Sequence, residues 1–414
     1  MNKKGIVAVI IGVILVISGL ILVLYLFFFA EDPEEVVQGL RDALPFGDRS
    51  SSIRDSDSVD VPDEPSRPVD KERVLRRLSE HPVAEGGAYS FVKDGETYVR
   101  YISRGEGNLY ELKLSEYEGH DTLLGNNEGL FSGAHKVSWI DENNVIIYSL
   151  ENDGYVANIA TVSFSEDGDG LVWSGGQLPD ETLTYAISPE DRTFFYAIRE
   201  DSGIRGFTAS FGSVGTVTGR HVFSSPFREW TADWPSRNVV TLTTKPSGHV
   251  PGHMYTLDPT SGSVSHVLRG IYGLTTNTNN DASFILYNES VGNGVSINFY
   301  DNQEKAHNNI KDIVTMADKC LWKEKDILIC AVPASIPSAT YPDAWYQGKV
   351  SFNDDGFKKV NISNNTVKKY FTPGDLRTGV EEMDAYELFF DDEKKNLFFI
   401  DKKTGHLWVY HIPE

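Results

Sequence analysis

The stretch YAISPEDRTFFYAIRED, residues 185–201, decides the fold of this chain of 414 residues. An apolar run (185–187) leads into a polar turn (188–192), and a second run rich in aromatic residues follows (194–199). Short runs of this composition on either side of a turn are typical of two antiparallel strands. The stretch therefore predicts an inner strand, a tight turn and a second strand.

The same unit recurs along most of the chain. Its seven copies are 88–102, 137–150, 186–198, 231–244, 275–288, 320–332 and 387–400. Their turn positions are 47, 49, 46, 44, 44 and 68 residues apart. A period in the forties with several short strands per repeat is typical of a β-propeller. We therefore expect an all-β, seven-bladed β-propeller; an irregular β-sandwich is the alternative, but its strands would not recur in one register.

A long uncharged segment precedes the repeats. Residues 5–30 are an apolar run of 26 residues, longer than the roughly 20 needed to cross a bilayer. Lys3 and Lys4 precede it and acidic residues follow it, which places the N-terminus in the cytoplasm. A cleaved signal peptide would have a shorter apolar region and a small-residue cleavage site. We expect an uncleaved, single-pass anchor in the cell membrane, with the lipid bilayer as its first partner.

The composition suggests three segments. Residues 1–30 are the transmembrane anchor, and 31–70 are an acidic stalk rich in Ser and Pro that lacks the apolar side chains needed to fold. Residues 71–414 form the extracytoplasmic propeller head. The net charge of −22 and the absence of a basic patch argue against nucleic acid as a partner.

The sixth repeat contains an insertion with an unusual aromatic cluster. Tyr341, Asp343, Trp345 and Tyr346 lie within eight residues of one another. If exposed, they would suit a peptide or glycan, because flat aromatic rings offer contact area at low entropic cost. The alternative is that Trp345 and Tyr346 cover the side of the sixth blade. The sequence contains no strong catalytic motif, and it predicts neither a metal site nor a cofactor.

The only two cysteines lie in the same repeat. Cys320 and Cys330 flank the turn 323–326, so a hairpin centred on Lys325 would set them opposite each other, within reach of a disulfide. An oxidising compartment permits this bond. The alternative is two buried free thiols, because free Cys is common in protein cores.

The two ends of the head are expected to meet. The last repeat ends after a third strand, at about 406–411, and therefore lacks an outer strand. The segment 73–78 precedes the first repeat much as an outer strand (265–269) precedes the repeat at 275–288. We expect 73–78 to pair antiparallel with 406–411, which would protect an otherwise open sheet edge.

The pattern AISPEDRTFFYA (186–197) resembles the Ser-Pro-Asp-Gly repeat of WD-repeat-like propellers, including the TolB type and the dipeptidyl-peptidase IV type. Five stretches further resemble a family of bacterial membrane-anchored β-propellers of uncharacterised function. These are 75–79, 99–102, 234–246, 319–333 and 341–348. The resemblance implies the fold and the anchor but no activity.

Three functions fit these observations. The first is a non-catalytic binding or scaffold module of the cell envelope, with a protein, peptide or glycan as partner. The second is a hydrolase or lyase whose acid–base groups line the propeller channel, and the third is a rigid subunit of an envelope assembly. A convergence of carboxylates or histidines with perturbed pKa values would favour the enzyme, whereas a large exposed apolar patch would favour the assembly.

Overall fold

The computed structural model describes residues 75–116, 121–125, 131–151, 154–164, 171–211, 215–371 and 382–412. The chain divides into two compact units, Met1–Arg67 and Pro68–Glu414. The expected anchor (1–30) and stalk (31–70) lie outside the described residues. Within the described ranges, no helix is both long enough and apolar enough to cross a membrane.

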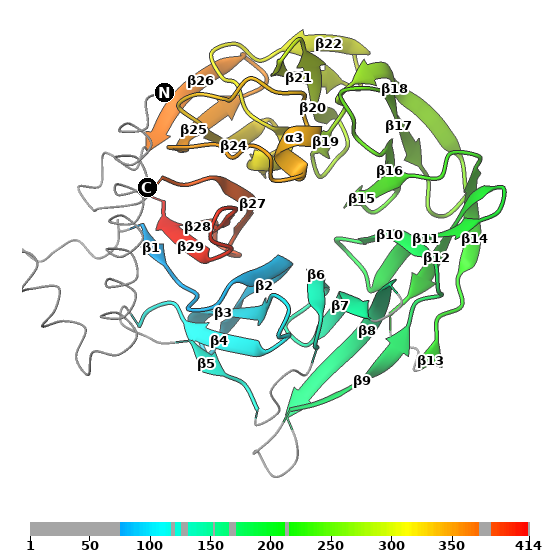
Figure 1. The fold of residues 1–414 in the computed structure, drawn as a ribbon, viewed down its shortest axis with the longest axis vertical. Helices are drawn as coiled ribbons and strands as arrows, with labels where there is room; N and C mark the ends of the chain where they lie inside the picture. Colours follow the sequence, from blue (N-terminus) through cyan, green and yellow to red (C-terminus); the bar gives the residue numbers. More distant parts are fainter. Residues whose placement is uncertain are drawn as a thin grey trace, which may run out of the picture. The chain divides into compact units, whose positions relative to one another are not determined.

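The second unit is nearly all β-structure. Figure 1 shows its sheets following one another around a centre, with the first strand of each repeat nearest the centre. Four sheets have four strands each. Neighbouring strands in these sheets follow one another along the chain, except that one sheet skips a strand that joins another sheet. Their strands are β10 (Thr182–Ile187), β11 (Thr193–Glu200), β12 (Gly203–Ser210) and β14 (Arg220–Ser225); β15 (Trp230–Ser236), β16 (Val239–Thr244), β17 (Pro251–Leu257) and β18 (Val264–Tyr272); β19 (Thr276–Thr278), β20 (Phe284–Val291), β21 (Gly294–Asp301) and β22 (Ala306–Asn309); and β23 (Cys320–Glu324), β24 (Ile327–Val332), β25 (Gly356–Asn361) and β26 (Thr366–Phe371).

A fifth sheet has nine strands because two repeats touch. One half contains β2 (Val83–Lys93), β3 (Glu96–Ser103), β4 (Leu109–Lys113) and β5 (Thr122–Leu123). The other half contains β6 (Ala134–Trp139), β7 (Asn144–Glu151), β8 (Gly154–Phe164) and β9 (Leu171–Gln177), with β13 (Gly215–Thr216) added beside β9. A single parallel bridge, between Glu85 on β2 and Lys136 on β6, joins the two halves.

The sequence repeats correspond to hairpins of this structure. The seven copies fall on β2–β3, β6–β7, β10–β11, β15–β16, β19–β20, β23–β24 and β27–β28. In the first copy Asp94 and Gly95 both have positive φ, 52° and 78°, as a two-residue hairpin turn of the I′ type requires. The predicted hairpin architecture is therefore confirmed.

The predicted ring closure is also confirmed. The sixth sheet has the order β1-β29-β28-β27, with β1 (Arg76–Arg77), β27 (Ala385–Phe390), β28 (Asn396–Asp401) and β29 (Leu407–His411). Arg76 pairs antiparallel with Val409, and Arg77 pairs with Trp408. Leu75 and Leu78 on either side of β1 are both buried. The paired segment is shorter than the predicted strand 73–78, and of its residues only 75–78 are described.

The core lies between neighbouring sheets, and the stretch 185–201 shows why its pattern repeats. Phe194 and Tyr196 pack with residues of β7 and β8 on one side. Phe195 and Ala197 pack with residues of β15 and β16 on the other. Because side chains alternate along a strand, each inner hairpin buries one set of residues against the preceding repeat and the other set against the following one.

The insertion of the sixth repeat follows β24 and contains the helix α3 (Asp343–Tyr346). A short 3-10 helix, η2 (Ala317–Lys319), precedes β23. Together with Tyr341, Trp345 and Phe352, buried residues such as Met316 form a small apolar core between these segments. The insertion is therefore a packed layer on the ring and not an extended loop.

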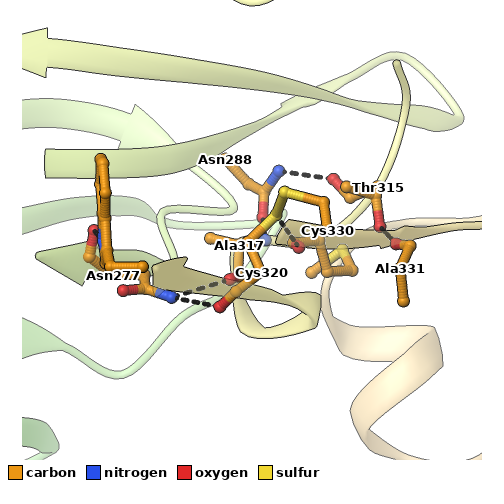
Figure 2. The surroundings of a disulfide bond; sticks show 9 residues. Asn277, Asn288, Thr315, Ala317, Cys320, Cys330 and Ala331 are labelled. Atoms are coloured by element: carbon orange, nitrogen blue, oxygen red, sulfur yellow. Dashed lines mark hydrogen bonds between the residues drawn. A yellow bond between two sulfur atoms is a disulfide. The ribbon is translucent and has the colours of Figure 1, made fainter. Parts of the chain in front are cut away.

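A disulfide joins Cys320 on β23 to Cys330 on β24 (Figure 2). The two residues are direct register partners, with their Cα atoms 4.0 Å apart. The surrounding backbone is held by side-chain amides, as Figure 2 shows: Asn277 donates to the carbonyl groups of Ala317 and Cys320, and Asn288 donates to that of Thr315. This bond fixes the hairpin directly after η2.

Candidate functional site

A group of ionisable side chains lies on the innermost strands and on the segments that pack on them. We call it the inner-strand cluster; it consists of Glu85 on β2, Lys136 on β6, Asp318 on η2, Tyr346 on α3 and Glu387 on β27. Lys136 Nζ lies 3.6 Å from Glu85 Oε1, and the two side chains are 49% and 42% exposed. Solvent, and so a small ligand, can reach this pair.

An irregularity of β2 positions Glu85. The pairing of β2 with β3 shifts register between Val83 and Ala88, so the segment between them bulges out of the ladder. Gly86, in this bulge, has a φ of +67°, and a Cβ at this position would lie 2.3 Å from the Val137 carbonyl oxygen. Only glycine fits there, and its backbone N–H points to another strand: it donates to Glu387 Oε2 at 2.7 Å. The bulge therefore brings Glu85 and Glu387 together.

Glu387 has an unusual backbone of its own. It is not a glycine, yet its φ is +50°, a conformation that costs on the order of 1 kcal/mol or more. The pairing of β27 with β28 shifts register between Tyr386 and Phe389. Such bulges often occur beside functional sites, where they redirect a side chain. Here the bulge turns Glu387 toward the first repeat.

The pKa values of Glu387 and Lys136 show which cluster members hold a proton. Desolvation, followed by the charge of Glu85, raises the pKa of Glu387 to about 8. Glu387 therefore keeps its proton at neutral pH. Desolvation lowers the pKa of Lys136, but its acidic neighbours, above all the charge of Glu85, outweigh this effect, and the pKa is raised overall. Lys136 thus stays cationic and cannot serve as a base.

A second acid pair stands close to the first. The Tyr346 hydroxyl donates to Asp318 Oδ2 at 2.5 Å. Tyr346 is 45% exposed as a whole. Desolvation of its hydroxyl, followed by the charge of Asp318, raises its pKa. Desolvation also raises the pKa of Asp318, and the charge of Glu85 adds to the effect. Both groups are within electrostatic reach of Glu85.

Two further inner-strand groups border the cluster. Tyr185 on β10 accepts a hydrogen bond from Ser138 at 3.1 Å, and desolvation raises its pKa. Asp233 on β15 accepts the N–H of Trp234 at 2.8 Å, and desolvation raises its pKa as well. The inner strands β10, β15 and β27 therefore each present an acidic or phenolic group with a raised pKa.

The four residues of the insertion that were expected to bind a ligand differ in their exposure to solvent. Tyr341 and Trp345 are buried, at 0% and 2% exposure, so neither can touch a ligand. Asp343 ties the insertion to the ring, accepting from Ser247 Oγ at 3.0 Å and from Gly248 N at 2.6 Å. Tyr346 alone is exposed. Tyr341 and Trp345 pack against Phe352, so the expectation that all four residues are exposed to a ligand is corrected, and Trp345 instead packs within the sixth repeat, as the alternative held.

The inner-strand cluster suits proton transfer better than metal binding. Among the described residues, no group of three His, Cys, Asp or Glu side chains is arranged to hold a metal ion. A protonated carboxyl beside a second carboxylate and a fixed ammonium is the combination that general acid–base catalysis uses. The sequence signal for it was a charged residue at the inner-strand start in three copies, at 85, 136 and 387.

Comparisons with known proteins agree on the fold. No protein-family model and no curated protein matches the sequence. An oligogalacturonate lyase from Vibrio parahaemolyticus is similar in structure, with 12% identity, a TM-score of 0.53, and coverage of 84% of this chain and 95% of that one. A puromycin hydrolase aligns with 10% identity and a TM-score of 0.50, over 81% of this chain; the chain spans only 56% of that protein. TolB from Acinetobacter baumannii has a TM-score of 0.38, too low to support an argument. The chain thus has a β-propeller fold.

Proposed function

We propose that the chain is an extracytoplasmic propeller enzyme of the hydrolase or lyase class, with the inner-strand cluster as its acid–base site. Glu387 is the general acid and Glu85 is the general base. The single observation that carries the proposal is the contrast between these two carboxyls: Glu387 retains its proton up to about pH 8, whereas Glu85 faces the Lys136 ammonium at 3.6 Å. Pairs whose environments differ in this way reveal acid and base roles.

The finer architecture belongs to the same proposal. The head has seven blades, each repeat supplying one, and β1 completes the last. Residues 1–30 anchor it in the cell membrane with the N-terminus in the cytoplasm, and 31–70 hold the head away from the bilayer. Support comes from the seven sequence copies, from the closure by β1 and β29, and from the charges on either side of the apolar run.

The charge of the site indicates the substrate. The cluster and its border contain four carboxyls, Glu85, Asp233, Asp318 and Glu387. Lys136 is the one cation among the cluster members. A neutral substrate, such as an uncharged oligosaccharide or a peptide bond, is favoured over an anionic one. Lys136 is already paired with Glu85, so a uronate would lose its hydration without gaining a free cation from the cluster. Since Lys136 stays protonated, it stabilises negative charge and takes no proton.

The test compares bond cleavage in the wild type and in two matched variants. The purified chain is incubated with neutral aryl glycosides, neutral peptide anilides and oligouronates. We expect turnover of a neutral substrate, with a rate that falls above about pH 8 as Glu387 loses its proton. Glu387→Gln should lose at least about a hundredfold in rate, while Glu229→Gln, an exposed carboxyl paired with Lys245, should retain full activity. A Glu387→Gln variant as active as the wild type would refute the assignment.

A binding module is the second candidate, and one observation favours it. A groove of about 650 Å³ lies beside the insertion and is lined by Val295, Ile313, Pro333, Ile336 and Lys358, among others. Residues 333–336 belong to the insertion, and insertions in repeat proteins often form the binding face. A peptide or glycan that binds the wild type and Glu387→Gln equally, without being cleaved, would favour this candidate.

A further inference from the structure

Lys319 is a buried lysine with no access to water. It ends η2, and its side chain is 0% exposed, as are those of its two acidic partners. Its Nζ donates to Asp355 Oδ2 at 2.7 Å and also to Asp384 Oδ1. Aromatic rings surround the amine, with the Phe352 centroid 5.0 Å away and that of Trp345 5.7 Å away. This site therefore holds one amine and two carboxyl groups out of contact with water, although removing three charged groups from water is costly.

The charges in this pocket do not balance if all three groups are ionised. One ammonium would face two carboxylates in a dry environment, and neutralising one carboxyl by a proton removes the excess charge. Asp355 is the carboxyl group that takes this proton. Its Oδ1 is buried and has no hydrogen-bond partner among the described residues, and burial raises its pKa to about 6. Protonation of Oδ1 gives a neutral acid beside Lys319.

Asp384 is held in a different way. Its Oδ2 accepts two hydrogen bonds, from Trp345 Nε1 at 3.1 Å and from the backbone N–H of Phe352 at 2.9 Å. Its own backbone N–H donates to Asp401 Oδ1 at 3.0 Å. Two N–H donors on one carboxyl oxygen form the arrangement that stabilises an oxyanion during acyl transfer. The other oxygen, Oδ1, faces the amine.

We propose that Lys319 and Asp384 form an intramolecular isopeptide bond, with Asp355 as the proton relay. Proton transfer within the pocket first gives a neutral amine at Lys319 and a neutral carboxyl at Asp384. The Nζ lone pair forms a bond to Cγ of Asp384, and the carbonyl electron pair moves to Oδ2, where Trp345 and Phe352 donate. A proton then passes from the nitrogen of Lys319 through the Asp355 carboxyl to the Oδ1 hydroxyl of Asp384, and this hydroxyl leaves as water. The net reaction converts one ammonium and one carboxylate into one amide and one water molecule, and Asp355 ends as it began.

The bond would link two neighbouring repeats. Lys319 directly precedes Cys320, which is joined to Cys330, and Asp384 directly precedes β27, 65 residues further along the chain. The disulfide closes the hairpin of one sheet, and the isopeptide bond ties that hairpin to the next sheet. It also replaces a buried ion pair by a neutral amide, which removes the cost of keeping two charges out of water.

Mass spectrometry of the wild-type full chain tests the proposal. After reduction and tryptic digestion, Lys319 should resist cleavage, and peptide 312–323 should appear attached to peptide 378–394, lighter than their sum by one water molecule. Processing at either end of the chain does not affect this readout. Attachment of 312–323 to 350–358, which contains Asp355, would overturn the assignment to Asp384. Cleavage after Lys319, with peptide 378–394 found unattached, would overturn the bond itself.

Three variants separate chemistry from packing. Lys319→Arg and Asp355→Asn should both give unlinked peptides, the first because the nucleophile is lost and the second because the relay is lost. Lys402→Arg is the matched control. Lys402 Nζ lies 4.8 Å from the same Trp345 ring, and the backbone N–H of Lys402 donates to the backbone carbonyl of Asp384 at 2.8 Å, a bond that the substitution keeps. This variant should keep the link. A linked product in Asp355→Asn would refute the relay. If a variant fails to fold, the wild-type peptide map still decides for or against the bond.

Discussion

Replacing Glu387 by Gln should change the pH dependence of stability with a defined sign. The folded chain holds the Glu387 proton up to about pH 8, whereas the unfolded chain releases it near the ordinary value of 4.5. The folded state therefore binds more protons across this window, and its stability falls as pH rises from 4.5 to about 8. Glutamine has the shape of the protonated acid and does not titrate, so the variant escapes this loss.

The magnitude follows from the shift. Each pKa unit corresponds to about 1.36 kcal/mol, so a shift from 4.5 to about 8 would give about 5 kcal/mol for a fully enclosed carboxyl. Glu387 is only partly buried and stands beside Glu85 and Lys136, which are 42% and 49% exposed. Water therefore screens much of the effect. We expect Glu387→Gln to gain about 2 kcal/mol relative to the wild type between about pH 5 and about pH 8.

Urea unfolding of both proteins at the two pH values measures the difference. Glu393→Gln is the control, because the hydrogen bond and charge of Lys395 lower the pKa of Glu393, and this exposed carboxyl is ionised throughout the window. Its stability relative to the wild type should not change between the two values. A Glu387→Gln difference that is equally independent of pH would show that Glu387 is not protonated in the folded protein, and it would remove the basis for its role as an acid.

Three further predictions address the scaffold. Gly86→Ala should cost about 2 kcal/mol more than Gly95→Ala in urea unfolding, because both have positive φ but only at Gly86 would a Cβ meet a carbonyl oxygen, at 2.3 Å; equal costs would contradict the crowding. Deleting 71–79 removes β1 and the buried Leu75 and Leu78 and should lower the melting temperature or cause aggregation, whereas deleting 45–65 should not; an unchanged melting temperature after the first deletion would contradict the closure. Thiol titration in denaturant should find no free thiol without reductant and two with it, and Cys320→Ser with Cys330→Ser should cost about 2 kcal/mol; two thiols without reductant would rule out the bond.

The hairpins could be predicted because their signals are local, and the closure because 73–78 precedes the first repeat as an outer strand precedes a later one. In the stretch 185–201 the alternation of Phe194, Phe195, Tyr196 and Ala197 already contains both neighbouring interfaces, and period-two alternation needs no tertiary information. The facing positions of Cys320 and Cys330 follow in the same way from a hairpin of known centre.

The aromatic cluster of the insertion was harder to interpret. Composition cannot distinguish a ring that stacks on a ligand from one that packs on its own sheet, because both uses favour Trp and Tyr. The outcome depends on Phe352 and Asp384, which give Trp345 a partner ring and a hydrogen-bond acceptor. These residues follow it by 7 and 39 positions, and no local pattern connects them.

The inner-strand cluster lies between these cases, because the closure that the sequence predicts also determines which repeats meet. Once 73–78 completes the last sheet, the inner strand of the last repeat must neighbour the inner strand of the first. A charged residue at the start of each strand, Glu387 and Glu85, then faces the other across the junction, although Gly86 and Glu387 are 301 positions apart. The two bulges that aim these side chains are not readable from composition. One sign was available: the Glu-Gly-Gly sequence at 85–87 interrupts a strand that is otherwise rich in β-formers, and glycine within a strand marks a bulge or a close backbone approach. Ring closure and a glycine-marked bulge together therefore point to the pair Glu85–Glu387, and neither signal does so alone.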